Sequence, residues 1–272
     1  MSTVKDLKDV FASEKDSDTL PVLFVGHGSP MNAIEDNEFS REWAVVGNAL
    51  QAPKAILCIS AHWQTRGTLV TAMKAPQTIH DFGGFPQDLF NKQYPAPGAP
   101  EFAKQTKELV KKTTIALDDS WGLDHGTWSV LCRMFPKADI PTYQLSLDYT
   151  QPPEFHYELA KELQELRNKG VLIIGSGNIV HNLRMVSFDK TDGFDWAIEF
   201  DEKIKKAIEE KDHKSIIHYE NYGSIAKLSI PTNEHYLPML YAIALQQKNE
   251  HISFFNTKKI AGSISMRSLL IS

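Results

Sequence analysis

Residues 22–30 read Val-Leu-Phe-Val-Gly-His-Gly-Ser-Pro, and the fold can be worked out from this stretch. Its first four residues are apolar, which is typical of a strand buried on both faces of a sheet. The last five cannot extend a sheet, because glycine frees the backbone and Pro30 lacks a backbone donor. The stretch therefore predicts a buried strand that ends in a loop carrying His27.

The same construction occurs twice more along the chain. Residues 55–59 read Ala-Ile-Leu-Cys-Ile and lead to His62, and residues 171–174 read Val-Leu-Ile-Ile and lead through Gly-Ser-Gly-Asn to His181. In an open parallel α/β sheet the carboxyl ends of the strands share one edge, and ligands bind there. We therefore expect His27, His62 and His181 to meet at one edge of a sheet.

Strand and helix patterns alternate along the chain, which favours a single α/β domain with a central, mainly parallel or mixed sheet flanked by helices. Residues 1–20 are expected to form a polar N-terminal arm and residues 21–272 one domain. Residues 77–100 show no clear periodicity and are interpreted as a functional covering loop. The expected strands are 22–25, 54–60, 68–73, 113–117, 141–147, 171–175, 252–256 and 262–270. The expected helices are 39–50 (capped by Asn37), 101–112, one that ends before Pro136, 154–169, one from Asn178, 194–211 and 236–246.

Composition excludes several classes of partner. The net charge of -5 and the pI near 6.1 provide no basic surface for nucleic acid or an anionic membrane. The longest nearly apolar stretch, 236–245, is too short to span a bilayer, and residues 1–20 lack the apolar core of a signal peptide. The two cysteines form no CxxC pair. We expect a cytoplasmic protein.

Histidine carries the strongest chemical signal in this chain. Of ten histidines, three follow buried strands, one stands in Asp-His-Gly between two tryptophans, and one precedes an apolar helix; these are His27, His62, His181, His125 and His235. Imidazole suits zinc, iron, copper and nickel, and three such ligands with an open position make a catalytic metal site. Asp124 is a candidate acceptor for a ring N–H of one of these histidines. His80, next to Asp81 in the chain, is a further candidate functional histidine.

Other catalytic motifs are weak or missing. Residues 175–180 contain GxG without the third glycine of a dinucleotide-binding loop. The sequence contains no GxSxG, HExxH or P-loop pattern, and Ser29, Ser60 and Ser176 do not lie in a nucleophile elbow. A serine hydrolase is therefore disfavoured.

Several motifs together resemble the LigB-type extradiol ring-cleaving dioxygenases, and most closely their DOPA 4,5-dioxygenase-like branch. The matching motifs lie in the family's order between about residues 21 and 270, nearly the whole chain. They are Gly26-His-Gly-Ser-Pro30, Ser60-Ala-His-Trp63, His80-Asp-Phe82, Gly84-Phe-Pro86, Leu123-Asp-His-Gly126, Gly175-Ser-Gly-Asn178, His181-Asn-Leu-Arg184 and Glu234-His235.

The resemblance implies one divalent metal ion per chain, held by His27, His62 and His235. It implies that His181 is the catalytic acid/base, with the further option of acting as a fourth metal ligand. His125 matches a second histidine that lines the substrate pocket. The wider family uses a carboxylate as third ligand, whereas His235 stands here, with Glu234 adjacent. Zinc is expected in the protein as isolated and Fe(II) for turnover, since zinc has no redox chemistry.

The expected reaction is the insertion of both atoms of O2 into a catechol ring, giving a muconic semialdehyde. The expected partners are a small aromatic diol and O2, and the protein is expected to be a monomer or a small homo-oligomer. The aromatic residues that could line the pocket around the catechol ring are Trp63, Phe82, Phe85, Trp121 and Trp128. The candidates to bind a substrate carboxylate are Arg66, Arg184 and Arg267. Two alternatives stay open: a zinc-dependent hydrolase on the same histidines, and a non-enzymatic binding protein of the Memo type.

Overall fold

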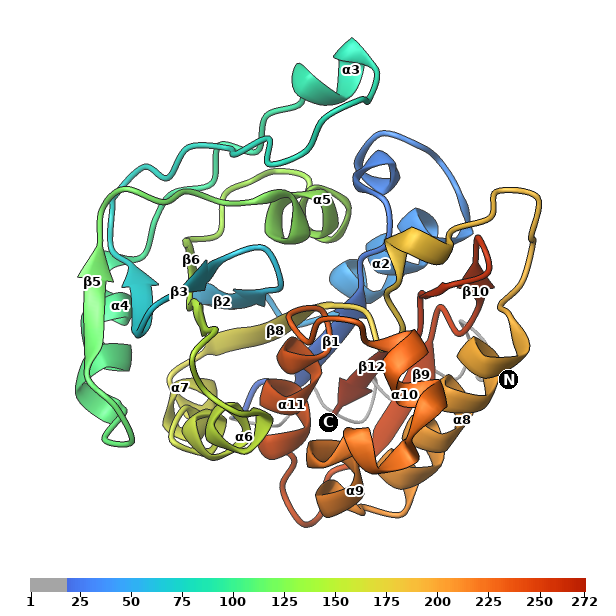
Figure 1. The fold of residues 1–272 in the computed structure, drawn as a ribbon. Helices are drawn as coiled ribbons and strands as arrows, with labels where there is room; N and C mark the ends of the chain where they lie inside the picture. The colour runs from blue at the N-terminus through green and yellow to red at the C-terminus, as the bar shows by residue number, and fades with distance from the viewer. Residues whose placement is uncertain (1–18) are drawn as a thin grey trace.

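The computed structural model describes residues 19–272, so the expected N-terminal arm lies almost entirely outside the described residues. A six-stranded mixed sheet forms the centre, in the order β6-β2-β8-β1-β12-β9 (Figure 1). Its parallel part consists of β1 (Val22–Gly26), β2 (Ala55–Ser60), β6 (Thr142–Gln144) and β8 (Val171–Gly177). Two further strands close one edge antiparallel to their neighbours, β12 (Ser268–Ile271) and β9 (Ile252–Phe255).

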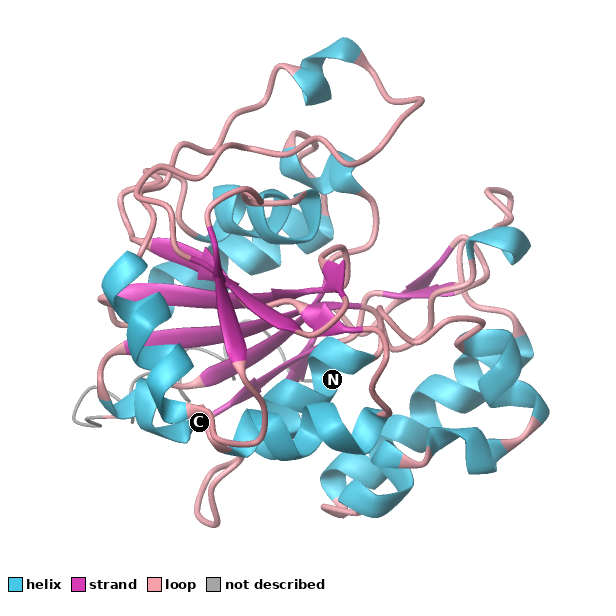
Figure 2. Cartoon of the chain, turned by 60° about the vertical axis from the view of Figure 1, so that its left-hand side comes forward, coloured by secondary structure: helices cyan, strands magenta, loops and turns pink. Residues whose placement is uncertain are grey.

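Helices cover both faces of this sheet (Figure 2). Alternate residues of β1 face opposite sides: Leu23 and Val25 pack with α2 (Glu38–Ala49) and α5 (His125–Met134). Val22 and Phe24 pack into the larger core on the other side. That core includes α6 (Pro153–Lys161), α7 (Gln164–Asn168), α8 (Asp195–Glu209), α9 (His213–Ile217), α10 (Ser224–Ser229) and α11 (Leu237–Ala244). The expected α/β domain with a mixed sheet between helices is confirmed.

Smaller elements surround this core. Two-stranded sheets are formed by β3 (Gln64–Thr65) with β7 (Leu147–Asp148), β4 (Thr68–Thr71) with β5 (Ile115–Asp118), and β10 (Lys259–Ile260) with β11 (Ile264–Ser265). Within residues 19–272 the remaining helices are α4 (Pro100–Leu109), α3 (Gln87–Phe90), and three 3-10 turns, η1 (Pro30–Ala33), η2 (Leu183–Met185) and η3 (Tyr219–Tyr222). The segment 77–99 leads out to α3 at the periphery of the ribbon in Figures 1 and 2, where α3 contacts η1 and buries Leu89 in the smaller core cluster.

The register of the parallel strands aligns the ends that carry histidine. Gly177 of β8 pairs with Gly26 of β1, and Ser176 pairs with Ser60 of β2. The backbone N–H of His27 continues this pattern by donating to the Gly177 carbonyl at 3.1 Å. The predicted meeting of three strand ends at one edge of the sheet is therefore confirmed.

Most predicted elements exist, and the main error is the helix expected from Asn178. The backbone N–H of Asn178 donates to the carbonyl of His235, and that of His181 donates to the carbonyl of Ser229. These donors bind distant segments, so they do not form the bonds of a helix, and only η2 follows. The predicted helix 154–169 is divided into α6 and α7, where bonds between residues three apart tighten the turn at Glu162 and Leu163.

The predicted strand 262–270 is likewise divided into β11 and β12, which belong to different sheets. In contrast, Asn37 caps α2 as expected: its side chain accepts from the backbone of Phe39 and Ser40. Among residues 19–272, no helix combines the length and the apolar character needed to cross a bilayer.

Candidate metal centre

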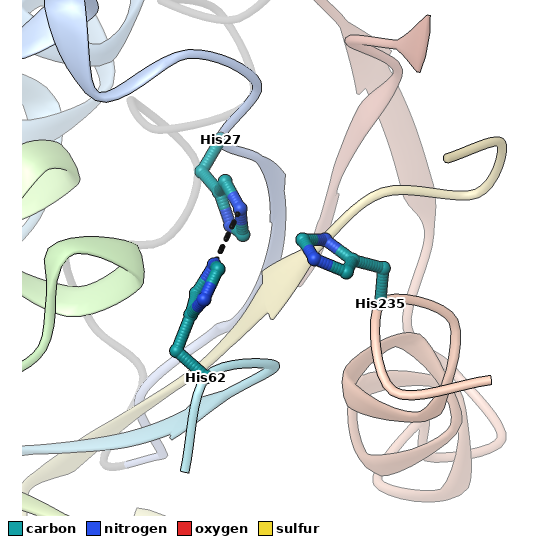
Figure 3. Close-up of side chains that lie close together, drawn as sticks. All are labelled: His27, His62 and His235. Carbon is teal, nitrogen blue, oxygen red and sulfur yellow. Dashed lines mark hydrogen bonds between the residues drawn. The ribbon is translucent and has the colours of Figure 1, made fainter. Parts of the chain in front are cut away.

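Three imidazoles converge at the carboxyl edge of the parallel strands (Figure 3). His27 follows β1, His62 follows β2, and His235 lies in the turn before α11. Each pair of rings has its centroids 5.1 Å apart, and the Nε2 atoms of His27 and His62 lie 3.2 Å apart. One potential ligand atom from each of the three lies within 4.8 Å of the others. These residues can therefore hold one metal ion.

Ser176 fixes which nitrogen of His27 faces this centre. The Ser176 hydroxyl donates to the carbonyl of Gly126 at 2.5 Å, and its oxygen lies 3.0 Å from His27 Nδ1. Because the hydroxyl proton is already used, the oxygen can only accept from His27, so Nδ1 carries the proton. The lone pair of His27 is then on Nε2, the atom that faces His62, and metal binding needs a lone pair there.

The position of His62 depends on a close approach by α5. A β-carbon at Gly126, in the first turn of that helix, would lie 2.9 Å from Cδ2 of His62 and 2.4 Å from the Ser60 hydroxyl. Real β-carbons do not make contacts of this kind, so only glycine lets the helix begin here without moving the imidazole.

The donor set fits a metal ion. Two nitrogen ligands at about 2.0–2.1 Å from a tetrahedral ion are separated by about 3.3–3.4 Å, close to the distance between the two Nε2 atoms. The Nδ1 atom of His235 is buried and has no hydrogen-bond partner among the described residues. A buried polar atom without a partner is costly, and a ligand in this cluster would remove that cost.

Burial keeps these histidines neutral. It lowers the pKa of His62 to about 3 and that of His181 to about 4, with the charge of His125 acting in the same direction. The pKa values of His27 and His235 are held well below the usual range, again by burial first and by neighbouring histidines second. Neutral imidazole is the form that binds metal and accepts protons.

His181 and His125 flank the three converging imidazoles. The ring of His181 stacks on that of His235, with centroids 3.4 Å apart and planes at 13°. The ring of His125 lies 3.8 Å from that of His62 at 46°. All five histidines singled out from the sequence are thus brought together.

Two carboxylates lie beside the imidazoles, Asp81 near His62 and His125 and Glu234 near His181 and His235, and the expectation for Asp124 is wrong. Asp124 is the N-cap of α5, and its oxygens accept from Ser60, Gln144 and other donors at that helix start. The Asp81 oxygen Oδ2 instead lies 3.0 Å from Nδ1 of His125 and 3.4 Å from Nδ1 of His62. Burial acts to raise the pKa of Asp81, but the contacts with His125 and His62 outweigh it and lower this pKa.

Other candidates are placed away from the converging imidazoles. His80 donates to the carbonyl of Lys92 and packs among Phe82, Phe90 and Trp128 within the covering loop. Arg267 is buried and paired with Asp201 and Glu202, so it is not available to a substrate carboxylate.

Of the five aromatic candidates, Phe82 meets the ring of His125 edge-on, with the ring centroids 5.5 Å apart. Trp63 and Trp121 stack on each other. Trp128 is fully buried, and its indole N–H donates a hydrogen bond to the carbonyl of Ile79. Of these three tryptophans, Trp128 belongs to the smaller core cluster.

Residues 21–263 match the family described as the catalytic LigB subunit of aromatic ring-opening dioxygenase. The chain belongs to the LigB family. It is therefore an extradiol ring-cleaving dioxygenase by family, as the sequence motifs indicated, and LigB dioxygenases are metal-dependent enzymes.

Relatives within the LigB family cover nearly the whole chain. A "4,5-DOPA dioxygenase extradiol" of Escherichia coli K12 is 44% identical over 97% of this chain and 98% of its own length. A protein of the same name from Beta vulgaris is 34% identical over 90% of this chain and 94% of its own length. The crystal structure of an uncharacterized Escherichia coli K12 protein superimposes with a TM-score of 0.80 at 40% identity, over 93% of this chain and 100% of its own.

Proposed function

We propose that this enzyme inserts both atoms of O2 into the ring of a DOPA-like catechol and gives a muconic semialdehyde. The observation that carries the proposal is the convergence of His27, His62 and His235, with the lone pair of His27 directed at His62. The DOPA-like substrate is inferred from the names of the relatives. The atoms balance without a further reductant, because catechol and O2 together contain all atoms of the product.

His27, His62 and His235 would hold the metal. Bound Fe(II) would supply the Lewis acidity that acidifies the catechol and the redox chemistry that dioxygen requires, whereas zinc, expected in the protein as isolated, would supply only the first. Three neutral imidazoles leave the charge of the ion uncompensated, which suits a site that binds an anionic diol.

His181 is proposed to take the proton of a catechol hydroxyl. Its ring stacks on the proposed ligand His235, so it stands at the edge of the metal centre. Its pKa of about 4 leaves the imidazole neutral at physiological pH, and a general base must be in that state. We therefore assign His181 to proton transfer; the same neutral state also fits the option of a fourth metal ligand, since His181 groups with Glu234 and His235.

His125 is proposed to line the substrate pocket and to return a proton as the ring opens. It lies against His62 on one side and against the edge of Phe82 on another. An aromatic substrate beside the metal would thus meet an imidazole on a rigid helix start and an apolar ring on the covering loop.

We further propose a cytoplasmic location and a monomer or small homo-oligomer. Both cysteines, Cys58 and Cys132, are free and buried, and burial raises their pKa values, so neither is poised to oxidise. A reducing compartment suits such thiols.

Oxygen uptake tests the proposed reaction. Metal-free protein would be loaded separately with Fe(II) and with Zn(II), then mixed in air with a panel of catechols that includes DOPA. We expect oxygen consumption and a coloured semialdehyde only with Fe(II), and mass spectrometry after reaction in 18O2 should find both labelled atoms in the product. Metal-free protein is the control.

Two results would overturn the proposal. Oxygen uptake by the Fe(II) protein no faster than by the metal-free control, for every catechol, would exclude this reaction. Hydrolysis of esters or amides by the zinc protein, without any oxygen requirement, would instead favour the hydrolase alternative.

A further inference from the structure

Asp81 contacts two of the five histidines from the covering loop. Its Oδ2 atom lies 3.0 Å from Nδ1 of His125 and 3.4 Å from Nδ1 of His62. Its Oδ1 atom accepts the backbone N–H of His125 at 2.9 Å. Asp81 as a whole residue is exposed, but its side chain is only 17% exposed, so its carboxylate contacts are partly shielded from water. One carboxylate thus joins the loop, the start of α5 and the loop after β2.

The backbone bond explains why this carboxylate stays in place. His125 is the first residue of α5, and the N–H groups of a first helical turn have no partner within the helix. Asp124 already accepts from the N–H of Thr127, so Asp81 supplies the acceptor for His125 from outside the helix. A negative charge at the start of a helix is also favourable.

The loop around Asp81 is anchored on both sides. The backbone of Ile79 donates to the carbonyl of Leu123, and the carbonyl of Ile79 accepts from the indole of Trp128. Phe82 packs against Trp128 and the ring of His125. The carboxylate is therefore fixed relative to α5 before any substrate binds.

This placement determines which nitrogen of each ring faces the centre. Both contacts are at ion-pair distance, and Nδ1 of His125 has no partner in hydrogen-bond geometry among the described residues. An ionised carboxylate can only accept, so a proton on the ring nitrogen nearest to it is favoured. With the proton on Nδ1, the lone pair of His62 is on Nε2, which lies 3.2 Å from Nε2 of His27. In His125, likewise, Nε2 is the nitrogen left without a contact to Asp81.

We propose that Asp81 is a positioning residue that sets the tautomer and orientation of His62 and His125 together. This inference rests on the proposed function, in which His62 is a metal ligand and His125 faces the substrate. Asp81 itself touches neither metal nor substrate in this assignment. The same carboxylate then orients the metal ligand His62 and the pocket residue His125.

The test compares Asp81→Asn with Asp88→Asn, which removes an exposed carboxylate from α3 on the same loop. An asparagine at position 81 can still accept the His125 backbone N–H, so the helix start is preserved. Its amide group, however, presents donors where Oδ2 accepts. Both rings should then shift the proton from Nδ1 to Nε2, which removes the lone pair that the metal requires.

Three measurements follow on each protein. Long-range 1H–15N spectra of the metal-free protein report the tautomer of each imidazole; chelator competition reports the affinity for Zn(II); oxygen uptake with Fe(II) and a catechol reports kcat and KM. For Asp81→Asn we expect Nε2–H tautomers, metal affinity lower by roughly 10- to 100-fold, and kcat lowered by a similar factor with KM changed less. Asp88→Asn should match the wild type in all three.

The wild-type spectrum alone can overturn the proposal, so the result does not depend on whether the variant folds. If metal-free wild type shows His62 and His125 with the proton on Nε2, Asp81 does not set their tautomers. Unchanged tautomers and metal affinity in Asp81→Asn would show that Asp81 serves only to accept the backbone N–H of His125 at the start of α5. If wild type consumes no oxygen with any catechol, the proposed function fails, while the spectra and the metal affinity still decide the role of Asp81.

Discussion

The carbonyl of His235 lies so close to Gly177 that a β-carbon at position 177 would stand 2.1 Å from its oxygen. The same carbonyl accepts the backbone N–H of Asn178 at 2.8 Å. The end of β8 and the turn before α11 are therefore in direct backbone contact. This contact brings a histidine from late in the chain to the edge where β1 and β2 end.

Gly177→Ala should disrupt the metal centre by moving His235. The added methyl meets backbone atoms, which cannot rotate away, so we expect a loss of stability of about 1–3 kcal/mol and a clear loss of metal affinity. Denaturant unfolding and zinc titration measure the two effects. Gly83→Ala is the control, because no atom lies within 4 Å of its β-carbon position. A Gly177→Ala protein that binds zinc like the wild type would contradict the argument.

Ser176→Ala should weaken metal binding and leave the fold intact. It removes the acceptor that holds the proton of His27 on Nδ1. We expect a decrease in zinc affinity of roughly 10- to 100-fold, measured by competition with a chelator. The matched control is Ser146→Ala, a buried serine that binds Leu69 and Thr65 and has no hydrogen bond to a histidine among the described residues. Equal affinities in the two variants would show that the Ser176 hydroxyl does not orient His27.

His181→Gln should separate metal binding from turnover. We expect the variant to retain its metal, while kcat for a catechol falls roughly 10²- to 10⁴-fold because the proposed general base is lost. Metal analysis and oxygen uptake give the two numbers. His80→Gln, a change among the loop aromatics, should leave kcat within a small factor of wild type. Loss of the metal from His181→Gln would instead place His181 among the ligands.

His156 should make folding stability depend on pH at a distance from the metal centre. It is fully buried on α6, with Nδ1 3.0 Å from the hydroxyl of Tyr241 on α11, and burial lowers its pKa to about 4. The unfolded chain has a histidine pKa near 6.5, so below that pH the unfolded state binds more protons. Its contribution to stability is therefore complete above about pH 6.5 and is lost as the pH falls toward 4.

The comparison of His156→Gln with wild type isolates this contribution. Glutamine does not titrate and can still bind the Tyr241 hydroxyl. Between pH 7 and pH 5 the stability of the wild type should fall by roughly 2 kcal/mol more than that of the variant. Urea unfolding at each pH provides the values, with exposed His218→Gln as control. Parallel pH profiles for wild type and His156→Gln would show that His156 is not the cause.

The strands that build the site could be predicted because their signal is local. An apolar run followed by glycine and histidine needs no distant partner to be recognised, and the edge shared by parallel strands then places His27, His62 and His181. The helix expected from Asn178 failed for the opposite reason. Its backbone donors bind His235 and Ser229, which lie more than forty residues away in the chain, and no local pattern reports such bonds.

The sequence alone determined the α/β architecture, the family and the five histidines, because each of these follows from residue order within short stretches. Only the tertiary structure decided which carboxylate lies against His125 and His62. Asp124 is adjacent to His125 in the chain, yet its side chain turns to the start of α5 and to Ser60, whereas Asp81 reaches both His125 and His62 from the covering loop. Side-chain direction depends on how the segments pack, and neighbourhood in the sequence does not encode it.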